Sequence, residues 1–348
     1  MVTKLFLNFK DSIIDSNISN QELFHTNIKE RLPNLIKGLN LSIFAFGQTS
    51  TGKTYTMRGD NNIPGIIQLS INEIFNLLKN STDILNYTVK VSYLEIYNET
   101  INDLLDAQKK NLDIRESTTR GIFIENLTEI ATESLEKAIF LLMQGDSVKI
   151  TAETKLNDKS SRSHAIFRIS LEIKKQEDGK LKTLTSQFNL IDLAGSENVS
   201  KAKTEGIRLR EGSNINKSLL ALSNVIHRLS FSKSFINYRD SKLTRLLQPA
   251  LAGNSKTMII CTLSQNPLSY QESLNTLHFG AKAKSLKTTI KINEVIDEKS
   301  KVMMENSQLK SKIRELEEMI TEKKGIDINN QVGSSDDINS QLKTQNDL

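Results

Sequence analysis

The sequence feature that most constrains this chain is residues 47–54, GQTSTGKT, which match the pattern G-x-x-x-x-G-K-[ST]. The apolar run Leu41–Phe46 comes directly before the motif, and the residues directly after it, Tyr-Thr-Met, can open a helix. In that context the glycines let successive backbone N–H groups turn towards a phosphate, and the helix N-terminus adds positive potential. The motif therefore predicts a phosphate-binding loop, or P-loop, between a buried strand and a helix.

Each residue of the P-loop has an expected role in binding a nucleotide. Lys53 is expected to reach the β and γ phosphates, and the Thr54 hydroxyl is expected to ligate Mg²⁺. The residues expected to contact the nucleotide here are Gly47, Gln48, Thr49, Ser50, Thr51, Gly52, Lys53 and Thr54.

A second segment supports a nucleoside triphosphatase site. Residues 189–195, NLIDLAG, form an apolar run that ends in an aspartate and a glycine. At the carboxyl end of a central strand, Asp192 is well placed to orient the water shell of Mg²⁺. Gly195 can turn its N–H towards the γ-phosphate, a turn that a side chain would restrict. Such a run alone says little, but beside a P-loop it supplies the second half of the site.

A third segment, residues 157–164 (NDKSSRSH), is an unusually polar loop that comes just before a predicted strand. Its hydroxyls could contact Mg²⁺ or the γ-phosphate, while Arg162 would seek a carboxylate. The alternative is an ordinary solvated turn.

Residues 1–285 read as one unit in which strand-like and helix-like runs alternate, which predicts a mixed sheet covered by helices on both faces. The first, fourth and fifth expected strands are almost continuously apolar, as central strands are, whereas the second and third alternate and are expected nearer an edge. The fold class is therefore α/β, a P-loop nucleotide-binding fold followed by a C-terminal helix. The expected strands are 41–46, 88–97, 165–174, 187–193 and 258–263, and the expected helices are 21–37, 65–80, 134–144, 213–230, 242–251 and 270–285.

Composition limits the class of partner and the compartment. The 348 residues carry a net charge of +5, which favours a polyanionic partner but does not choose between nucleic acid, a membrane surface and an acidic protein lattice. Cys261 is the single cysteine, so no disulfide can form within these residues; a reducing compartment is expected, with Cys261 as a small buried hydrophobe. No stretch reaches the roughly 18 apolar residues of a membrane span, so a soluble intracellular protein is expected.

The C-terminal part has three predicted segments. Residues 286–296 are polar and β-branched and suit a connector, and residues 297–324 suit the start of a coiled coil. The alternative for the second segment is an amphipathic helix that folds back on the domain. Residues 325–348 are rich in Asn, Asp, Ser and Gln, which predicts a disordered tail. The coiled-coil seam would consist of Val302, Asn306, Leu309, Ile313, Leu316 and Ile320, with Asn306 at an a position.

Taken together, the motifs resemble the kinesin motor domain over about residues 5–295. The P-loop reads GQTSTGKTYTM, the first switch NDKSSRSH and the second switch DLAGSE; SYLEIYNE, NINKSL, YRDSKLTRL and LNTLHFGA match as well. The YRDSKLTRLL segment and the ending INEV are most similar to the kinesin-7 branch. The resemblance implies ATP and Mg²⁺ as cofactors, and residues 286–296 as a neck linker.

The resemblance also assigns site residues. It implies that Ser160 and Ser161 sense the γ-phosphate, that Ser161 contacts Mg²⁺, and that Arg162 pairs with Glu197 to hold the attacking water in line. Lys53 and Gly195 complete the implied catalytic set. Tyr55 resembles the residue that stacks on adenine, the alternative being a core aromatic at a helix start, and His164 resembles a residue that supports the switches rather than a general base.

The implied partner is the microtubule, because tubulin is acidic and the cations of the matching segments would face it. These cations are Lys217, Arg239, Lys242 and Arg245, which could also form an ordinary solvated face. The resemblance further implies a plus-end-directed homodimer paired through the coiled coil, located on cytoplasmic or spindle microtubules, with no nucleic-acid partner and no membrane insertion.

The sequence departs from the family pattern at its start. The family begins with a strand carrying Arg-x-Arg-Pro, which packs on the adenine, whereas here residues 5–10 match the following strand. An incomplete adenine pocket is therefore expected, and the alternative function is a microtubule-binding protein with weak or no ATPase activity. A GTPase-type switch is disfavoured because NKSL at residues 216–219 lacks the aspartate of Asn-Lys-x-Asp.

Overall fold

The computed structural model describes most of the chain. The described residues are 2–7, 12–15, 17–60, 62–118, 121–154, 162–177, 180–197, 207–231, 236–286, 289–295 and 309–316. The chain divides into two units, Met1–Val295 and Ile296–Leu348.

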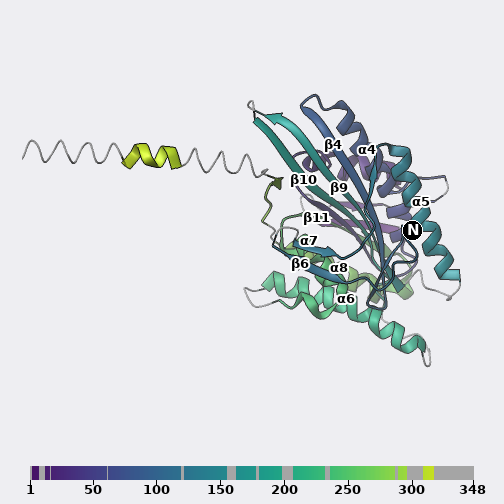
Figure 1. The fold of residues 1–348 in the computed structure, drawn as a ribbon. Coiled ribbons are helices and arrows are strands. Elements are labelled where there is room, and N and C mark those ends of the chain that lie inside the picture. The colour runs from purple at the N-terminus through teal and green to yellow at the C-terminus, as the bar shows by residue number, and fades with distance from the viewer. Residues whose placement is uncertain are drawn as a thin grey trace, which may run out of the picture. The chain divides into compact units, whose positions relative to one another are not determined.

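A large mixed sheet forms the centre of the first unit (Figure 1). Its described strands run in the order β2-β1-β11-β3-β10-β9-β4-β5, with β8 paired to β4 and β12 to β10, and β6 and β7 form a separate hairpin. The strands are β1 (Val2–Leu7), β2 (Ile13–Ile14), β3 (Leu41–Phe46), β4 (Ile84–Tyr97), β5 (Thr100–Asp103), β6 (Ile114–Ser117), β7 (Gly121–Ile124), β8 (Ile130–Thr132), β9 (Ser163–Glu177), β10 (Lys180–Asp192), β11 (Lys256–Ser264) and β12 (Glu294–Val295).

The parallel part of the sheet determines where a ligand can bind. Strand β3 pairs in parallel with β10 on one side and with β11 on the other, so that Ala45 lies beside both Asp192 and Ile260. Every residue of β3 is buried, as its continuous apolar sequence predicts. The carboxyl ends of three neighbouring strands therefore meet at one edge, which is where open α/β sheets bind ligands.

Helices cover both faces of the sheet (Figure 1). Helices α4 and α5 pack on one face, and α6, α7 and α8 pack together with β11 on the other. The helices are α1 (Asn20–Asn27), η1 (Lys29–Arg31), α2 (Pro33–Ile36), α3 (Lys53–Arg58), α4 (Ile66–Asn80), α5 (Leu135–Thr154), α6 (Ile207–Phe231), η4 (Tyr238–Asp240), α7 (Lys242–Ala252), η5 (Pro267–Ser269) and α8 (Tyr270–Lys284).

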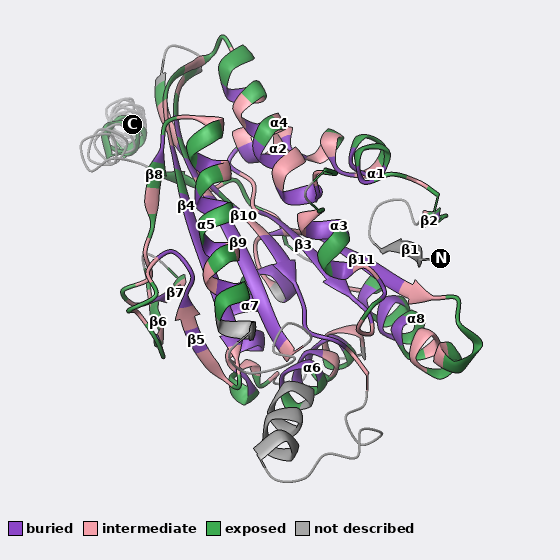
Figure 2. Cartoon of the chain, turned by 90° about the vertical axis from the view of Figure 1, so that its right-hand side faces the viewer, coloured by how far each residue is buried: buried purple, intermediate pink, exposed green. Residues whose placement is uncertain are grey.

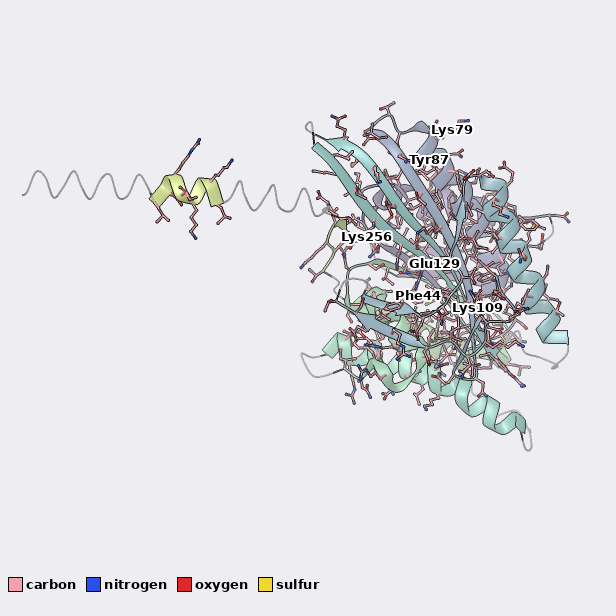
Figure 3. All side chains as sticks on the ribbon, viewed as in Figure 1. Phe44, Lys79, Tyr87, Lys109, Glu129 and Lys256 are labelled. Atoms are coloured by element: carbon pink, nitrogen blue, oxygen red, sulfur yellow. The ribbon has the colours of Figure 1, made fainter. Side chains whose placement is uncertain are left out.

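Alternation along β3 divides the core into two clusters. Ile43 and Ala45 belong to the cluster under α4 and α5, whereas Phe44 and Phe46 belong to the cluster under α6, α7 and α8. Figure 3 labels Phe44 on this strand, and Figure 2 shows the central strands of the sheet as largely buried. Burial on both faces confirms the predicted fold class.

The predicted elements are mostly confirmed, with one clear error. All five expected strands form, and β4 and β9 lie further towards an edge than β3 and β10, as their alternation predicts. The helix expected over residues 21–37 is wrong, because the chain forms α1, η1 and α2 instead. Pro33 has no backbone N–H and is tolerated best in the first turn of a helix, so it begins α2 rather than continuing α1.

Near the N-terminus, the structure has a strand close to the one expected over residues 5–10. Strand β1 pairs antiparallel with β11, from Val2 beside Ser264 to Leu7 beside Ile259, and with β2 on its other side. The strand expected over residues 5–10 is thus shifted towards the N-terminus, with residues 8–10 outside the described part.

The second unit has one described segment, residues 309–316, which is helical. Three of the six predicted seam residues lie here, and Leu309, Ile313 and Leu316 are all exposed. The other three, Val302, Asn306 and Ile320, lie outside the described residues, as do residues 325–348. The coiled coil and the disordered tail therefore stay predictions.

Two expectations drawn from composition can be compared with the structure. Cys261 is fully buried on β11, and burial raises the pKa of its thiol to about 12, so it behaves as a small hydrophobe. Within the described ranges, no helix has the length and apolar character that crossing a membrane requires.

We predict that Phe188→Ala lowers the free energy of unfolding by about 3–5 kcal/mol, because its ring is fully buried in the cluster under α4 and α5. Leu181→Ala on the same strand is the matched control, since that side chain is 61% exposed and should change stability by less than about 0.5 kcal/mol. Urea unfolding followed by circular dichroism measures both. Equal losses in the two variants would contradict the assigned core.

Candidate phosphate-binding site

The P-loop follows β3 and needs glycine at both ends. At Gly47 the backbone φ is +154°, and a Cβ there would lie 2.3 Å from the Thr262 carbonyl oxygen of β11. Gly52 has φ +89°, a left-handed conformation that precedes α3 directly. The Thr51 and Thr262 hydroxyls hydrogen-bond at 2.6 Å and hold the loop to β11. The loop is thus shaped by its neighbours before any ligand binds.

Lys53 begins α3 and is held across the loop. Its side chain is only 7% exposed, and Nζ donates to the Gln48 carbonyl oxygen at 2.8 Å. Burial lowers the pKa of Lys53, while the nearby carboxylates of Asp192 and Glu197 act in the opposite direction. A buried ammonium group next to the turned amides of a glycine loop suits a phosphate oxygen.

Thr54 and Asp192 form the part of the site that fits a hydrated cation. The Thr54 hydroxyl donates to Asp192 Oδ2 at 2.7 Å, and Asp192 ends the central strand β10. The second carboxylate oxygen, Oδ1, is buried and has no hydrogen-bond partner among the described residues. A hydroxyl beside an unsatisfied carboxylate oxygen is the donor set expected for Mg²⁺ with its waters.

The segment after β10 packs onto the P-loop. Ser196 N donates to the Gly47 carbonyl oxygen at 3.1 Å, and Thr49 N donates to Glu197 Oε2 at 2.7 Å. The Thr49 hydroxyl donates to the other oxygen of the same carboxylate. A Cβ on Gly195 would lie 2.3 Å from Thr49 Oγ1, so glycine is required for this approach. The Thr49 amide therefore already binds an anionic oxygen, which shows that the loop is arranged for anions.

A cavity of about 280 Å³ opens over these groups. Tyr55, whose side chain is 40% exposed, lies on its rim, where it could contact a base. The lining residues are Thr49, Ser50, Gly52, Lys53, Thr54, Tyr55, Leu193 and Gly195.

His164 connects three elements beneath the cavity. Its Nδ1 accepts a hydrogen bond from Ala194 N at 3.0 Å, so the ring hydrogen lies on Nε2, which is 2.8 Å from the Ser218 hydroxyl of α6. Burial, together with the nearby charges of Lys149 and Lys53, lowers the pKa of His164 to about 3. A neutral imidazole that is fully hydrogen-bonded on both nitrogens suits a support of the switches rather than a general base.

Some predicted site residues cannot be compared with the structure. Ser160 and Ser161 lie outside the described residues. Arg162 is described and partly buried, and the carboxylate of its expected partner Glu197 accepts a hydrogen bond from Thr49 N. The Arg162–Glu197 pair therefore stays a prediction.

The four cations expected to face tubulin fall into two groups. Lys217 and Arg239 are exposed. Lys242 and Arg245 are partly buried: Lys242 Nζ donates to the Leu112 carbonyl oxygen at 3.3 Å, and Arg245 pairs with Glu116 of β6. Sequence reasoning missed this because Glu116 is far away along the chain.

The expected connector lies along the sheet. Asn293 donates its backbone N–H to the Gly38 carbonyl oxygen at 2.9 Å and accepts from Thr185 N at 2.9 Å, after which β12 pairs with β10. The Asn293 side chain adds a second hydrogen bond to Gly38 at 2.9 Å. Sequence reasoning expected a connector here but had no signal for its pairing with β10.

The fold and the site together define a P-loop nucleotide-binding protein whose second phosphate-facing segment packs directly on the loop. Residues 6–286 match the model of the kinesin motor domain, and the chain belongs to the kinesin motor family.

Sequence similarity to individual kinesin-related proteins supports this assignment. The chain is 43% identical to kinesin-related protein 4 of Dictyostelium discoideum, with 95% of this chain and 16% of that protein aligned. It is 39% identical to the rice (Oryza sativa) kinesin-like protein KIN-7L, over 88% of this chain and 48% of the relative. It is 41% identical to human centromere-associated protein E, over 90% of this chain and 12% of that protein. The chain thus spans less than half the length of each of these relatives.

Solved structures show the same fold. One is a kinesin described as fast, 38% identical, with a TM-score of 0.73 over 84% of this chain and 85% of that one. Another is a KIF14 dimer with AMP-PNP in complex with a microtubule. It is 38% identical, with a TM-score of 0.74 over 80% of this chain and 81% of that one.

We predict a pH dependence of stability that comes from His164. Its folded pKa of about 3 lies below the usual 6.5, so the unfolded chain binds the proton more tightly and stability falls as pH drops below about 6.5. His164→Gln should remove up to about 1.4 kcal/mol per pH unit from this slope between pH 6 and 4. His278→Gln, an exposed site on α8, is the control. Urea unfolding at several pH values tests this, and equal slopes for His164→Gln and the parent would contradict it.

Proposed function

We propose that this chain hydrolyses ATP with Mg²⁺ and couples the hydrolysis to movement along microtubules. The observation that carries the proposal is the contact between the two phosphate-facing segments, in which the Thr49 amide binds the Glu197 carboxylate and Thr54 binds Asp192. One pair joins the P-loop region to the segment after β10 and the other joins it to the last residue of β10, so a change at the terminal phosphate would reach both. Membership of the kinesin motor family supports the rest.

The residues have the following proposed roles. Lys53 and the P-loop amides bind the phosphates, and Thr54 and Asp192 hold the hydrated cation. When bound, Mg²⁺–ATP supplies the phosphoryl group and the charge neutralisation. Gly195 brings its backbone close to the terminal phosphate, and Glu197, with Arg162, orients the attacking water. Positioning and electrostatics carry most of phosphoryl transfer, so loss of Glu197 should affect turnover more than binding.

The path from the site to the track runs through α6. His164 touches the segment after β10 through Ala194 and touches α6 through Ser218, one residue after the exposed Lys217. Lys217 and Arg239 are the cations best placed to meet an acidic lattice, and their attraction should weaken with salt. Lys242 and Arg245 would have to exchange their partners within the chain for tubulin.

Further aspects of the motor are proposals as well. Pairing of the connector with β10 supports a neck linker that docks and undocks with the nucleotide. A motor unit placed before a coiled coil favours a plus-end-directed homodimer on cytoplasmic or spindle microtubules. The seam residues Leu309, Ile313 and Leu316 are exposed and so open to a second copy.

A second candidate is a microtubule-binding protein with weak ATPase activity. In both candidates Tyr55, which lines the cavity, is the proposed adenine contact. The two candidates differ in whether microtubules stimulate turnover.

We predict that microtubules stimulate the steady-state ATPase activity of the parent chain, and that Glu197→Ala lowers this stimulated rate by about 100-fold or more while still binding nucleotide. Glu172→Ala is the matched control, because Glu172 is an exposed carboxylate of β9 far from the site. A phosphate-release assay and a nucleotide-binding assay measure the two properties. A parent that microtubules do not stimulate would favour the second candidate.

A further inference from the structure

The helix that carries the phosphate-binding side chains is short and is held at its far end by polar contacts. Helix α3 spans six residues, Lys53–Arg58. Asn20 Nδ2 of α1 donates to the Tyr55 carbonyl oxygen at 3.0 Å, and Gln68 Nε2 of α4 donates to the Arg58 carbonyl oxygen at 2.6 Å. Two neighbouring helices, seen beside α3 in Figure 2, thus bind the final carbonyl groups of α3.

A third helix holds the side chain of Arg58. Arg58 Nη2 forms an ion pair with Asp146 Oδ1 of α5, and the two side chains are only 12% and 19% exposed. The Tyr93 hydroxyl of β4 donates to the same carboxylate oxygen at 2.9 Å. Burial raises the pKa of Tyr93 well above its usual range, so the hydroxyl remains a donor.

The sequence of α5 is fitted to this arrangement. A Cβ on Gly145 would lie 2.3 Å from the Tyr93 ring, so only glycine allows the ring this close to the helix. Glycine inside a helix is otherwise less favourable than alanine. Neighbouring residues Gly145 and Asp146 thus provide room for the ring and an acceptor for its hydroxyl.

The ion pair links α3 to α5. Two charges largely withdrawn from water hold each other firmly, because breaking one partner leaves the other buried and uncompensated. Arg58 is on the same rigid helix as Lys53 and Thr54, so a displacement of its end also moves the groups expected to bind phosphate and Mg²⁺. Arg58, Asp146 and Tyr93 are not among the residues that line the cavity.

We propose that Arg58, Asp146 and Tyr93 are positioning residues that fix α3 against α5 and thereby set the affinity of the P-loop for nucleotide phosphates. The inference rests on the proposed function, because it assumes that the P-loop binds a nucleotide.

The experiment uses the 348-residue chain without microtubules and measures the dissociation constant for MgADP by calorimetry, together with KM and kcat for ATP. Arg58→Met keeps the length and loses the charge, and Asp146→Asn keeps the shape and loses the charge. Each should raise the MgADP dissociation constant about tenfold, with kcat changing less than KM. The double variant should have about the same MgADP dissociation constant as either single variant, because the two residues act as one pair.

Conservative replacement and a distant ion pair are the controls. Arg58→Lys retains the charge and should stay within about threefold of the parent, although it loses the planar fork. Lys29→Met breaks the 3.2 Å ion pair with Glu73, which joins η1 to α4 without involving α3. It should leave the MgADP dissociation constant within about twofold of the parent. An unchanged constant in Arg58→Met and Asp146→Asn, or an equal rise in Lys29→Met, would overturn the proposal.

A second variant keeps the test decisive if the charge variants do not fold. Tyr93→Phe retains the ring and the ion pair and removes one donor, so its melting temperature should stay close to that of the parent. A rise of the MgADP dissociation constant by at least about twofold supports the proposal, and no rise overturns it. If the parent chain binds no MgADP, the proposed function fails; if the parent binds and the variants bind equally well, only this inference fails.

Discussion

The contact on which the rest of the site depends is the packing of residues 194–197 against the P-loop. Gly195 allows the approach because it has no side chain, and the Glu197 carboxylate binds the Thr49 amide and hydroxyl. The Thr49 amide of the P-loop thus donates to an anionic oxygen. Lys53 and the unsatisfied oxygen of Asp192 complete a set of groups that fits a triphosphate and a hydrated cation.

The sheet positions these groups at one edge, and their position at that edge could be predicted from the sequence. Strand β3 is apolar throughout and leads into GQTSTGKT, and β10 ends in Asp192, so both segments were expected at one sheet edge. The prediction failed at residues 21–37, where one helix was expected, although Pro33 was the available signal for a break. Strands β5 to β8 were not expected, because each is short and its pairing depends on distant neighbours.

Contacts between residues far apart in sequence account for what could not be predicted. The hydrogen bond between Thr49 and Glu197 and the ion pair between Arg245 and Glu116 were not expected from the sequence. Neither partner is near in the chain, and a charge alone does not reveal which opposite charge the fold brings to it. The Arg58–Asp146 pair was missed for the same reason.

The most direct test of the central claim is calorimetric titration of the chain with a non-hydrolysable ATP analogue and Mg²⁺. The account predicts one binding site per chain, with affinity lowered at least about tenfold in Lys53→Ala, because a buried ammonium group that contacts the anion is lost. Lys256→Ala, which removes a lysine bound to Asn34 at the start of β11, should bind like the parent. No binding by the parent chain, or equal binding by Lys53→Ala, would contradict the account.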